Sequence, residues 1–189
     1  IKIKSIFFIL TFFLFSCQPT EKLDDVVFNY NNIPKITINA EQIKINNLYE
    51  SKFDEPFIDH SVDKPPILFL NKWFDKNINI FGSENLFVVN VFESSLKKSE
   101  IPNIDKKKYQ EDSIFLYEVN FLVEFILYDD ANFILASSIV ESKRTTTSGK
   151  YISLHDSSVI TESLIIDSLI DFTNKTKELI TQHMQNYIL

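Results

Sequence analysis

Histidine and carboxylate side chains are the residues of this chain whose types suit acid–base or metal chemistry. The sequence contains three histidines, His60, His155 and His183, which lie far apart along it. Only His60 has acidic neighbours at ligand-like spacing, Asp59 and Asp63, and a zinc site would need a thiol or a second nearby histidine as well. We interpret this cluster as part of a solvated loop, so the sequence predicts no metal site.

The motifs that position nucleophiles or phosphate groups in enzymes require glycine, and this chain contains only two glycines. It has no G-x-S-x-G turn and neither of the glycine-rich phosphate loops, G-x-x-x-x-G-K-[ST] and G-x-G-x-x-G. Asp167 and Asp171 are paired at spacing i, i+4, and we expect both to face water. Glu118 and Glu124 lie on the outer side of a predicted strand and would be functional only if that side lined a groove. The sequence predicts a protein that is not an enzyme and needs no cofactor.

Cys17, the only cysteine, has the clearest predicted chemistry, because it ends an export signal. Two lysines precede an apolar run at 6–15, and Ser16 is a small residue before the expected cut. The sequence Leu-Phe-Ser-Cys at 14–17 resembles a bacterial lipobox, whose cysteine accepts diacylglycerol. The apolar run is about 10 residues long, whereas a membrane span needs about 20, so acyl chains on Cys17 are the expected anchor. The alternatives are an ordinary cleaved signal, which would leave a free thiol, and a short uncleaved apolar tail.

Charge and composition set the class of the remaining chain. Its 189 residues include 26 acidic and 19 basic ones, and this balance disfavours nucleic acid as a partner. Eighteen phenylalanines and seven tyrosines favour a densely packed domain that contains β-strands. We expect a signal peptide at 1–16, a lipid-anchored tether at 17–32 and a single domain at 33–189.

Apolar residues at every second position predict four β-strands in this domain. The strands are expected within residues 35–45, 86–94, 115–128 and 133–147. The buried face of the third strand is expected to consist of Tyr117, Val119, Phe121, Val123, Phe125 and Leu127. Turn residues at 129–132 join the last two strands into an antiparallel hairpin, while the polar stretch 96–112 is expected to be a loop.

Two helices complete the predicted domain. The proline pair at 65–66 opens the first helix, which is expected to end at Gly82. Ser153, with Asp156 three residues later, forms a variant capping box that starts a second helix extending nearly to Leu189. The order β-α-β-β-β-α predicts a two-layer α+β fold, in which a four-stranded, mostly antiparallel sheet carries two helices on one face.

Two sets of residues are candidates for contact with other molecules. The predicted loop 96–112 gathers positive charge that would attract anionic lipid, although acidic neighbours dilute it. Its lysines are Lys97, Lys98, Lys106, Lys107 and Lys108. Ile160 and Leu164 lie away from the main apolar stripe of the last helix, so they are either covered by strand and loop segments or form a patch for a protein partner. The free edges of the sheet could also accept a strand from a partner.

From Pro65 to the C-terminus, roughly two-thirds of the chain, an ordered set of features resembles a known family. The features are Pro66 and Trp73 in the first helix, Gly82, Glu93-Ser94-Ser95-Leu96 at a strand end, Tyr109, Arg144, and Ser153-Leu154. The family is one of small uncharacterised lipoproteins of Gram-negative bacteria. In architecture the chain also resembles auxiliary lipoproteins of envelope transport, including those of lipopolysaccharide assembly.

The resemblance implies a periplasm-facing protein that is anchored through Cys17 and acts as an accessory or interaction subunit of an envelope assembly or transport complex. Its partners would be the membrane and an envelope protein. Gln18 follows the cysteine in place of the aspartate that favours inner-membrane retention, so the resemblance favours the outer membrane. The alternative is a lipid-binding carrier that holds an acyl chain between helices and sheet.

Overall fold

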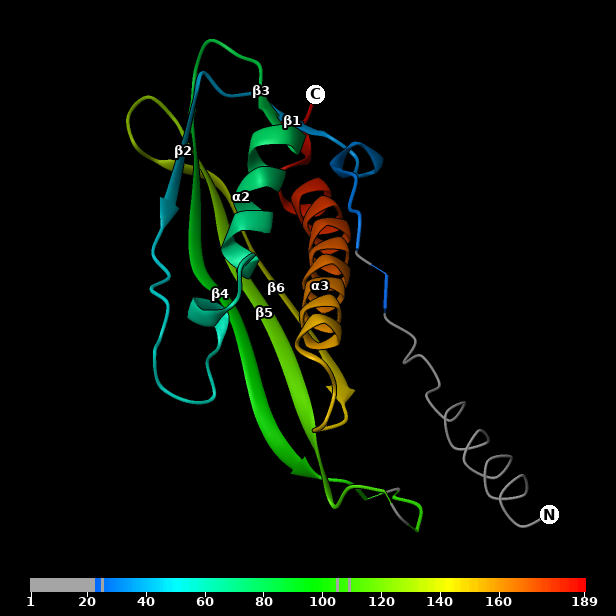
Figure 1. Ribbon diagram of the computed structural model, residues 1–189. Coiled ribbons are helices and arrows are strands. Elements are labelled where there is room, and N and C mark those ends of the chain that lie inside the picture. The colour runs from blue at the N-terminus through cyan, green and yellow to red at the C-terminus, as the bar shows by residue number, and fades with distance from the viewer. Residues whose placement is uncertain (1–22, 25, 105, 109) are drawn as a thin grey trace, which may run out of the picture.

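The computed structural model describes residues 23, 24, 26–104, 106–108 and 110–189. Four of its strands form one sheet in the order β2-β4-β5-β6 (Figure 1). These strands are β2 (Gln42–Asn47), β4 (Leu86–Pro102), β5 (Ser113–Tyr128) and β6 (Ile134–Ser148). β2 pairs with β4 in parallel, and the other two pairs are antiparallel. The predicted α+β fold with a mostly antiparallel sheet is therefore confirmed.

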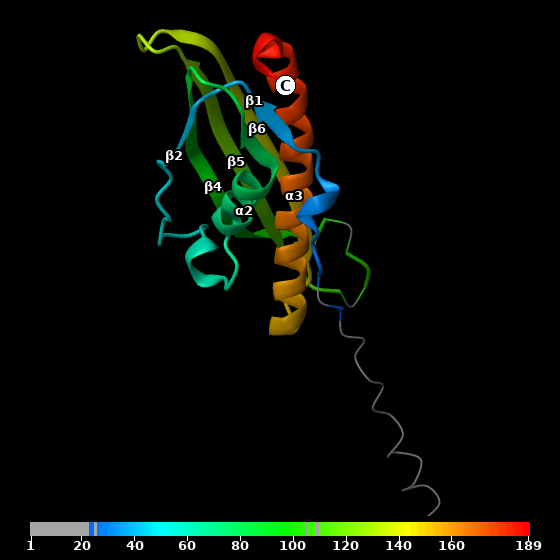
Figure 2. The ribbon, with the colours of Figure 1, turned by 90° about the horizontal axis from the view of Figure 1, so that it is seen from above.

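Two helices, α2 (Pro66–Asn77) and α3 (Leu154–His183), cover the same face of this sheet, as Figure 2 shows. α2 packs against β4, while α3 packs mainly against β6 and also against β5. Short 3-10 helices occur at η2 (Tyr30–Asn32), η3 (Asp59–Ser61) and η4 (Gln185–Tyr187). Among the described residues, no helix has the length and apolar character needed to cross a membrane.

The core lies between the helices and the inner face of the sheet. All six β5 residues predicted to point inward are at most 1% exposed, because alternate side chains of a strand share one face. The helices meet them with Trp73, Phe74 and Phe172, each also at most 1% exposed. The Trp73 ring lies 5.6 Å from that of Phe172 in an edge-on arrangement, and Phe172 lies 5.6 Å from Phe121. Packed rings thus fill the space in which the carrier alternative would place an acyl chain.

The β5–β6 hairpin and the start of α3 follow the sequence prediction. Asp129 Oδ1 accepts hydrogen bonds from the backbone of Ala131 and Phe133 and so closes the hairpin turn. The Ser153 hydroxyl accepts a 3.0 Å hydrogen bond from the Asp156 backbone N–H, as expected of a helix cap. α3 ends at His183, earlier than predicted.

The C-terminal residues return to the body of the fold beyond α3. The Leu189 backbone N–H donates to the Thr37 carbonyl, and the Asn39 N–H donates to the Tyr187 carbonyl. These hydrogen bonds draw the chain toward β1 (Ile36–Ile38), which pairs in parallel with β3 (Ile78–Ile80). The polar backbone near the C-terminus is therefore satisfied by a strand instead of by a longer helix.

The prediction of one strand within 35–45 was wrong, because the chain forms β1 and β2 there. Asn39, Ala40 and Glu41 separate these strands, and Ala40 is 1% exposed. β1 pairs with β3 and β2 with β4, so the chain must change partner between them. The Glu41 N–H donates to the Glu84 and Asn85 carbonyls and fixes that change. The apolar residues shift from even positions, ending at Ala40, to odd positions, beginning at Ile43, and the change of partner falls at this shift.

The sequence predicted that Gly82 ends the preceding helix, and this prediction was wrong. α2 stops at Asn77 because Ile78 enters β3 directly. A Cβ atom on Gly82 would lie 2.9 Å from the Ala40 backbone nitrogen, closer than real Cβ atoms approach. Glycine at this position lets the loop after β3 pack against the turn between β1 and β2.

The predicted loop at 96–112 was too long, because β4 continues to Pro102. Lys97 pairs with Glu118 of β5, and Lys98 pairs with Tyr117. At this end the β4–β5 pair extends past α3 (Figure 1), so its residues need not alternate between apolar and polar. The prediction relied on apolar residues at every second position, and this pattern disappears where no helix covers the inner face of the sheet.

Part of the predicted tether at 17–32 belongs to the folded structure. Val26 and Phe28 pack against the core, and Tyr30 is 8% exposed. The Tyr30 hydroxyl donates to the Phe69 carbonyl at 3.4 Å, and burial raises the pKa of Tyr30 to about 12. The predicted signal at 1–16, Cys17 and the tether residues up to 22 lie outside the described residues.

Candidate functional site

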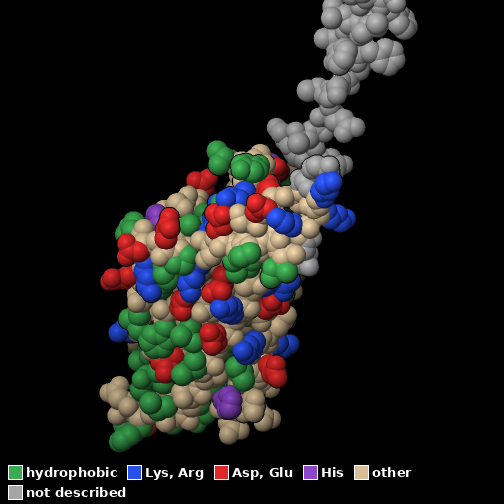
Figure 3. Space-filling model, turned by 90° about the horizontal axis from the view of Figure 1, so that it is seen from below, with side chains coloured by type: hydrophobic (Ala, Val, Ile, Leu, Met, Phe, Trp, Pro, Cys, Tyr) green, Lys and Arg blue, Asp and Glu red, His purple; other side chains and the backbone are tan. Residues whose placement is uncertain are grey.

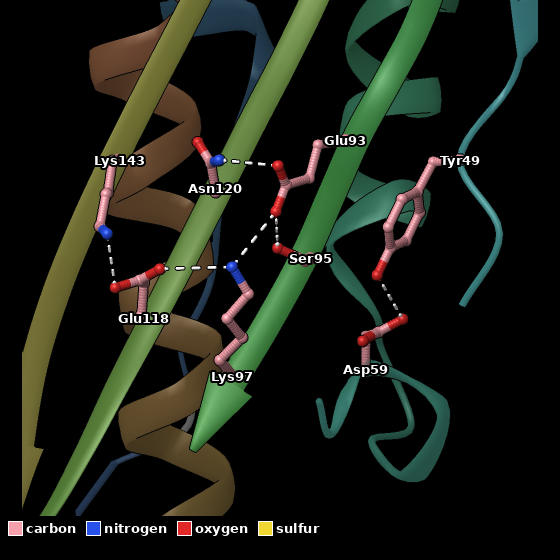
Figure 4. Close-up of polar contacts among 8 residues, drawn as sticks. All are labelled: Tyr49, Asp59, Glu93, Ser95, Lys97, Glu118, Asn120 and Lys143. Atoms are coloured by element: carbon pink, nitrogen blue, oxygen red, sulfur yellow. Dashed lines mark hydrogen bonds and ion pairs between the residues drawn. The ribbon is translucent and has the colours of Figure 1, made fainter. Parts of the chain in front are cut away.

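Charged and amide side chains form a network on the outer face of the sheet, which neither helix covers (Figure 4). Lys97 Nζ lies between two carboxylates, 3.4 Å from Glu93 Oε1 and 3.5 Å from Glu118 Oε1. Glu118 Oε2 also accepts from Lys143 at 2.8 Å, and Glu93 accepts from Asn120 at 3.0 Å. The network crosses three strands, because residues paired in register across a sheet present their side chains to the same face.

Electrostatics of this network keep Glu118 ionised. Partial burial alone would raise the pKa of Glu118, but the hydrogen bonds and charges of Lys143 and Lys97 outweigh burial and hold the pKa below its ordinary value. The hydrogen bond from Lys143 to Glu118 raises the pKa of Lys143 in turn. Glu118, predicted to be functional only if it lined a groove, therefore neutralises two lysines across the strands.

Replacing Glu118 with glutamine is expected to lower the free energy of unfolding at pH 7 by about 1 kcal/mol, because a partly buried ion pair with Lys97 and a more exposed one with Lys143 lose their anion. The folded chain lowers the Glu118 pKa, so this stabilisation is complete above the unfolded value, 4.5, and is lost as the pH falls through the folded value. Urea unfolding from pH 7 to pH 3 measures the difference. Glu124→Gln is the matched control, because Glu124 lies on the same face but accepts from Asn90. An equal loss in both variants at pH 7 would contradict this role of the lysines.

The cluster of Asp59, His60 and Asp63 is not arranged as a ligand set. Asp59 is 2% exposed, and its Oδ2 accepts from the Tyr49 hydroxyl at 3.2 Å. Burial, followed by the negative charge of Asp59, raises the pKa of Tyr49. His60 Nδ1 lies within hydrogen-bonding distance of the Lys52 carbonyl oxygen, at 3.0 Å. Within the described ranges, no three His, Cys, Asp or Glu side chains are placed to hold a metal ion.

The five candidate lysines do not form one basic loop. Lys97 points to the outer face of the sheet, whereas the Lys98 ammonium lies 3.9 Å from the centre of the Phe115 ring. Lys106, Lys107 and Lys108 belong to the loop at 103–112, where Lys106 pairs with Asp112. Because β4 extends further than predicted, Lys97 and Lys98 lie in this strand and contact other residues of the fold.

Of the two candidate patch residues, Leu164 is 3% exposed and belongs to the core, whereas Ile160 is half-buried. Of the two alternatives left open by the sequence, Leu164 is therefore covered by other segments and does not form a surface patch. β6 lies under this side of α3, and Arg144 of β6 reaches Asp171 at 2.6 Å and Asp167 at 3.5 Å. Those two carboxylates, expected only to face water, are ion-pair partners of the strand.

The chain that leads from the N-terminus attaches to the first turn of α3, which sequence reasoning missed. The Leu23 backbone N–H donates to Asp156 Oδ1 at 3.3 Å, and His155 Nε2 donates to the Leu23 carbonyl at 2.7 Å. The hydrogen bond from Ser153, and then that from Leu23, lowers the pKa of Asp156. The cap predicted at Ser153 placed Asp156 in the first turn of the helix, but no sequence pattern indicated that Leu23 would return to it.

An exposed apolar surface, here called the apolar tip, occupies the opposite end of the molecule. It consists of Phe81 (76% exposed), Phe133 (70%), Ile134 (60%) and Leu135 (38%). A 3.3 Å hydrogen bond from the Asn85 N–H to Asp130 joins the loop after β3 to the β5–β6 turn, so these residues share one end. No sequence signal identified the tip, because a turn between strands gives no indication of whether its apolar side chains are covered.

A cleft of about 450 Å³ opens where α3 begins, between this helix, the strands β4 and β5, and the segment 58–63 around η3. Tyr117 and Lys98 line it from the sheet, and Leu154, Ser158 and Thr161 line it from α3. Trp73, Phe121 and Phe172, which fill the space between helices and sheet, do not line this cleft, so it differs from the acyl-chain site that the carrier alternative predicts.

Comparison with known proteins finds similarity in structure but not in sequence. No protein-family model matches the chain, and no curated protein matches it. A minor lipoprotein from Acinetobacter baumannii is 9% identical, with a TM-score of 0.41 over 77% of this chain and 93% of that chain. Rare lipoprotein B from Shewanella oneidensis is 14% identical, with a TM-score of 0.40 over 75% and 95%.

A third structure is similar over a larger share of this chain. It is a neuraminyllactose-binding hemagglutinin homolog from Helicobacter pylori, which is 12% identical, with a TM-score of 0.29 over 92% of this chain and 94% of that chain. The structure is therefore similar to those of bacterial lipoproteins. This similarity concerns the fold alone.

Proposed function

We propose that this chain is a lipid-anchored protein of the cell envelope that holds a protein partner through its apolar tip. Cys17 is the acyl acceptor, and the protein faces the periplasm. Gln18, which follows the cysteine in place of aspartate, favours the outer membrane. It acts as an accessory subunit of an envelope assembly or transport complex and performs no catalysis itself.

The position of the apolar tip is the observation that carries this proposal. Exposed apolar side chains that gather in one place mark interaction sites in soluble proteins. In Figure 1 the loop after β3 and the β5–β6 turn, which carry the tip, lie toward the end of the molecule where α3 finishes, whereas Leu23 contacts the first turn of α3. A helix of 30 residues is about 45 Å long, so a partner at the tip would be held well away from the anchor.

The test is to purify the tagged full chain from native envelopes in mild detergent, after brief cross-linking, and to identify the proteins that accompany it. Phe133→Asp combined with Ile134→Asp is expected to remove one stoichiometric partner, because two charges would be buried against apolar surface. Membrane fractionation of the variant should be unchanged.

The matched control is Val27→Asp, since Val27 is 92% exposed but lies away from the tip. This control should retain the partner, and circular dichroism should confirm that all variants are folded. A partner that remains bound to the double variant, or that is lost equally from the control, would count against the tip as the binding surface. A specific lipid without any protein would favour the carrier instead.

A further inference from the structure

The proposed anchor can reach only one end of this molecule. Five residues separate Cys17 from Leu23 in the sequence. At no more than about 3.6 Å per residue, the six steps between the two residues span at most roughly 20 Å. Leu23 is hydrogen-bonded to Asp156 and His155 in the first turn of α3. This end of the helix is therefore held close to any bilayer in which Cys17 is embedded.

The same end exposes large side chains that suit a lipid surface. Ile104 is 91% exposed, Tyr151 is 86% exposed and Leu154 is 92% exposed. Ile104 belongs to the loop after β4, Tyr151 belongs to the connection between β6 and α3, and Leu154 is the first residue of α3. The Lys150 N–H donates to Glu111 Oε2 at 2.6 Å and ties the two segments together. Tyrosine suits the boundary between water and hydrocarbon, because its ring is apolar and its hydroxyl is polar.

Charge at this end is compatible with anionic lipid, because Glu100 and Asp112 are paired with lysines within the fold. Glu100 pairs with Lys150 at 2.7 Å, and Asp112 pairs with Lys106. These pairs hold the pKa of each carboxyl below its ordinary range, while Lys107 and Lys108 add positive charge to the loop. Figure 3 views the molecule from this end and shows hydrophobic side chains interspersed with basic and acidic ones.

We propose that the end of the molecule that carries Ile104, Tyr151 and Leu154 lies against the bilayer, with these three side chains at the lipid interface. This inference rests on the proposed anchoring at Cys17. A short linker keeps these side chains at high effective concentration near lipid. In this orientation the apolar tip lies on the side of the molecule that faces away from the membrane, where the partner would bind.

The experiment exploits the single cysteine of the chain, whose thiol is blocked once it is acylated. Leu154→Cys introduces a unique free thiol at the proposed contact, and Phe133→Cys introduces one at the apolar tip, where the native side chain is 70% exposed. Each full-length lipidated variant is labelled with the same fluorophore. Both are reconstituted into phosphatidylethanolamine–phosphatidylglycerol vesicles that contain a nitroxide-labelled lipid.

Flotation of the vesicles is measured first and quenching of the fluorophore second. We expect both variants to float, with severalfold stronger quenching of the label at position 154 than of the label at position 133. Flotation with equal or weaker quenching at position 154 would overturn the orientation while leaving the anchor intact. Failure of both variants to float would overturn the anchor itself, and this inference with it.

Discussion

Replacing Cys17 with serine is expected to abolish incorporation of fatty acid into this protein and to release it from the membrane fraction. A serine hydroxyl does not replace the thiol that accepts diacylglycerol. Each buried CH2 group contributes about 0.8 kcal/mol to membrane binding, so several acyl chains on one residue dominate attachment. Acylation is the attachment that this substitution tests.

The measurement must separate lipidation from retention of the uncut signal. Metabolic labelling with an alkyne fatty acid tests lipidation directly in the full-length chain. For fractionation, residues 1–16 are replaced in the serine variant by a signal that the general signal peptidase cleaves. Ser16→Gly is the matched control, because it keeps a small residue before the cysteine and should be labelled like the native chain. Label that persists in Cys17→Ser, or is absent from the native chain, would contradict the proposed acceptor.

The parts of the fold that sequence reasoning predicted are those in which one local rule decides the outcome. In β5, every second residue from Tyr117 to Leu127 is buried, because both helices lie over one face of the sheet. Ser153 begins α3 because its hydroxyl satisfies an otherwise unpaired N–H. In both cases the residue pattern and its physical cause occur within the same segment.

The parts that were missed depend on contacts between distant segments. Nothing within residues 96–102 distinguishes a polar strand from a loop, and their pairing with residues 113–119 of β5 decides the matter. The attachment of Leu23 to Asp156 joins residues that are 133 positions apart. Leu164 was a candidate for the surface because its helix is apolar on more than one side, and only the packing of α3 against β6 shows that it is covered.

Truncating Trp73 to alanine is expected to lower the free energy of unfolding by about 3–5 kcal/mol, the usual loss for a fully buried aromatic side chain. Trp73 is 0% exposed, and its ring lies 5.2 Å from that of Phe74 and 5.6 Å from that of Phe172. The indole thus fills the junction of α2 and α3, and alanine would leave a cavity there. Because total stabilities are about 5–15 kcal/mol, the variant should unfold at much lower urea concentration.

Trp73→Phe separates the loss of packing from the loss of the indole N–H group. In the described part of the structure, Trp73 Nε1 is buried without a hydrogen-bond partner, and such a group costs about 1–3 kcal/mol. Phenylalanine removes that cost while keeping most of the ring contacts, so we expect it to retain nearly the native stability. Unfolding is followed by circular dichroism, since the only tryptophan is lost. If alanine and phenylalanine lower the free energy of unfolding equally, packing of an aromatic ring at this junction is not what stabilises the contact between α2 and α3.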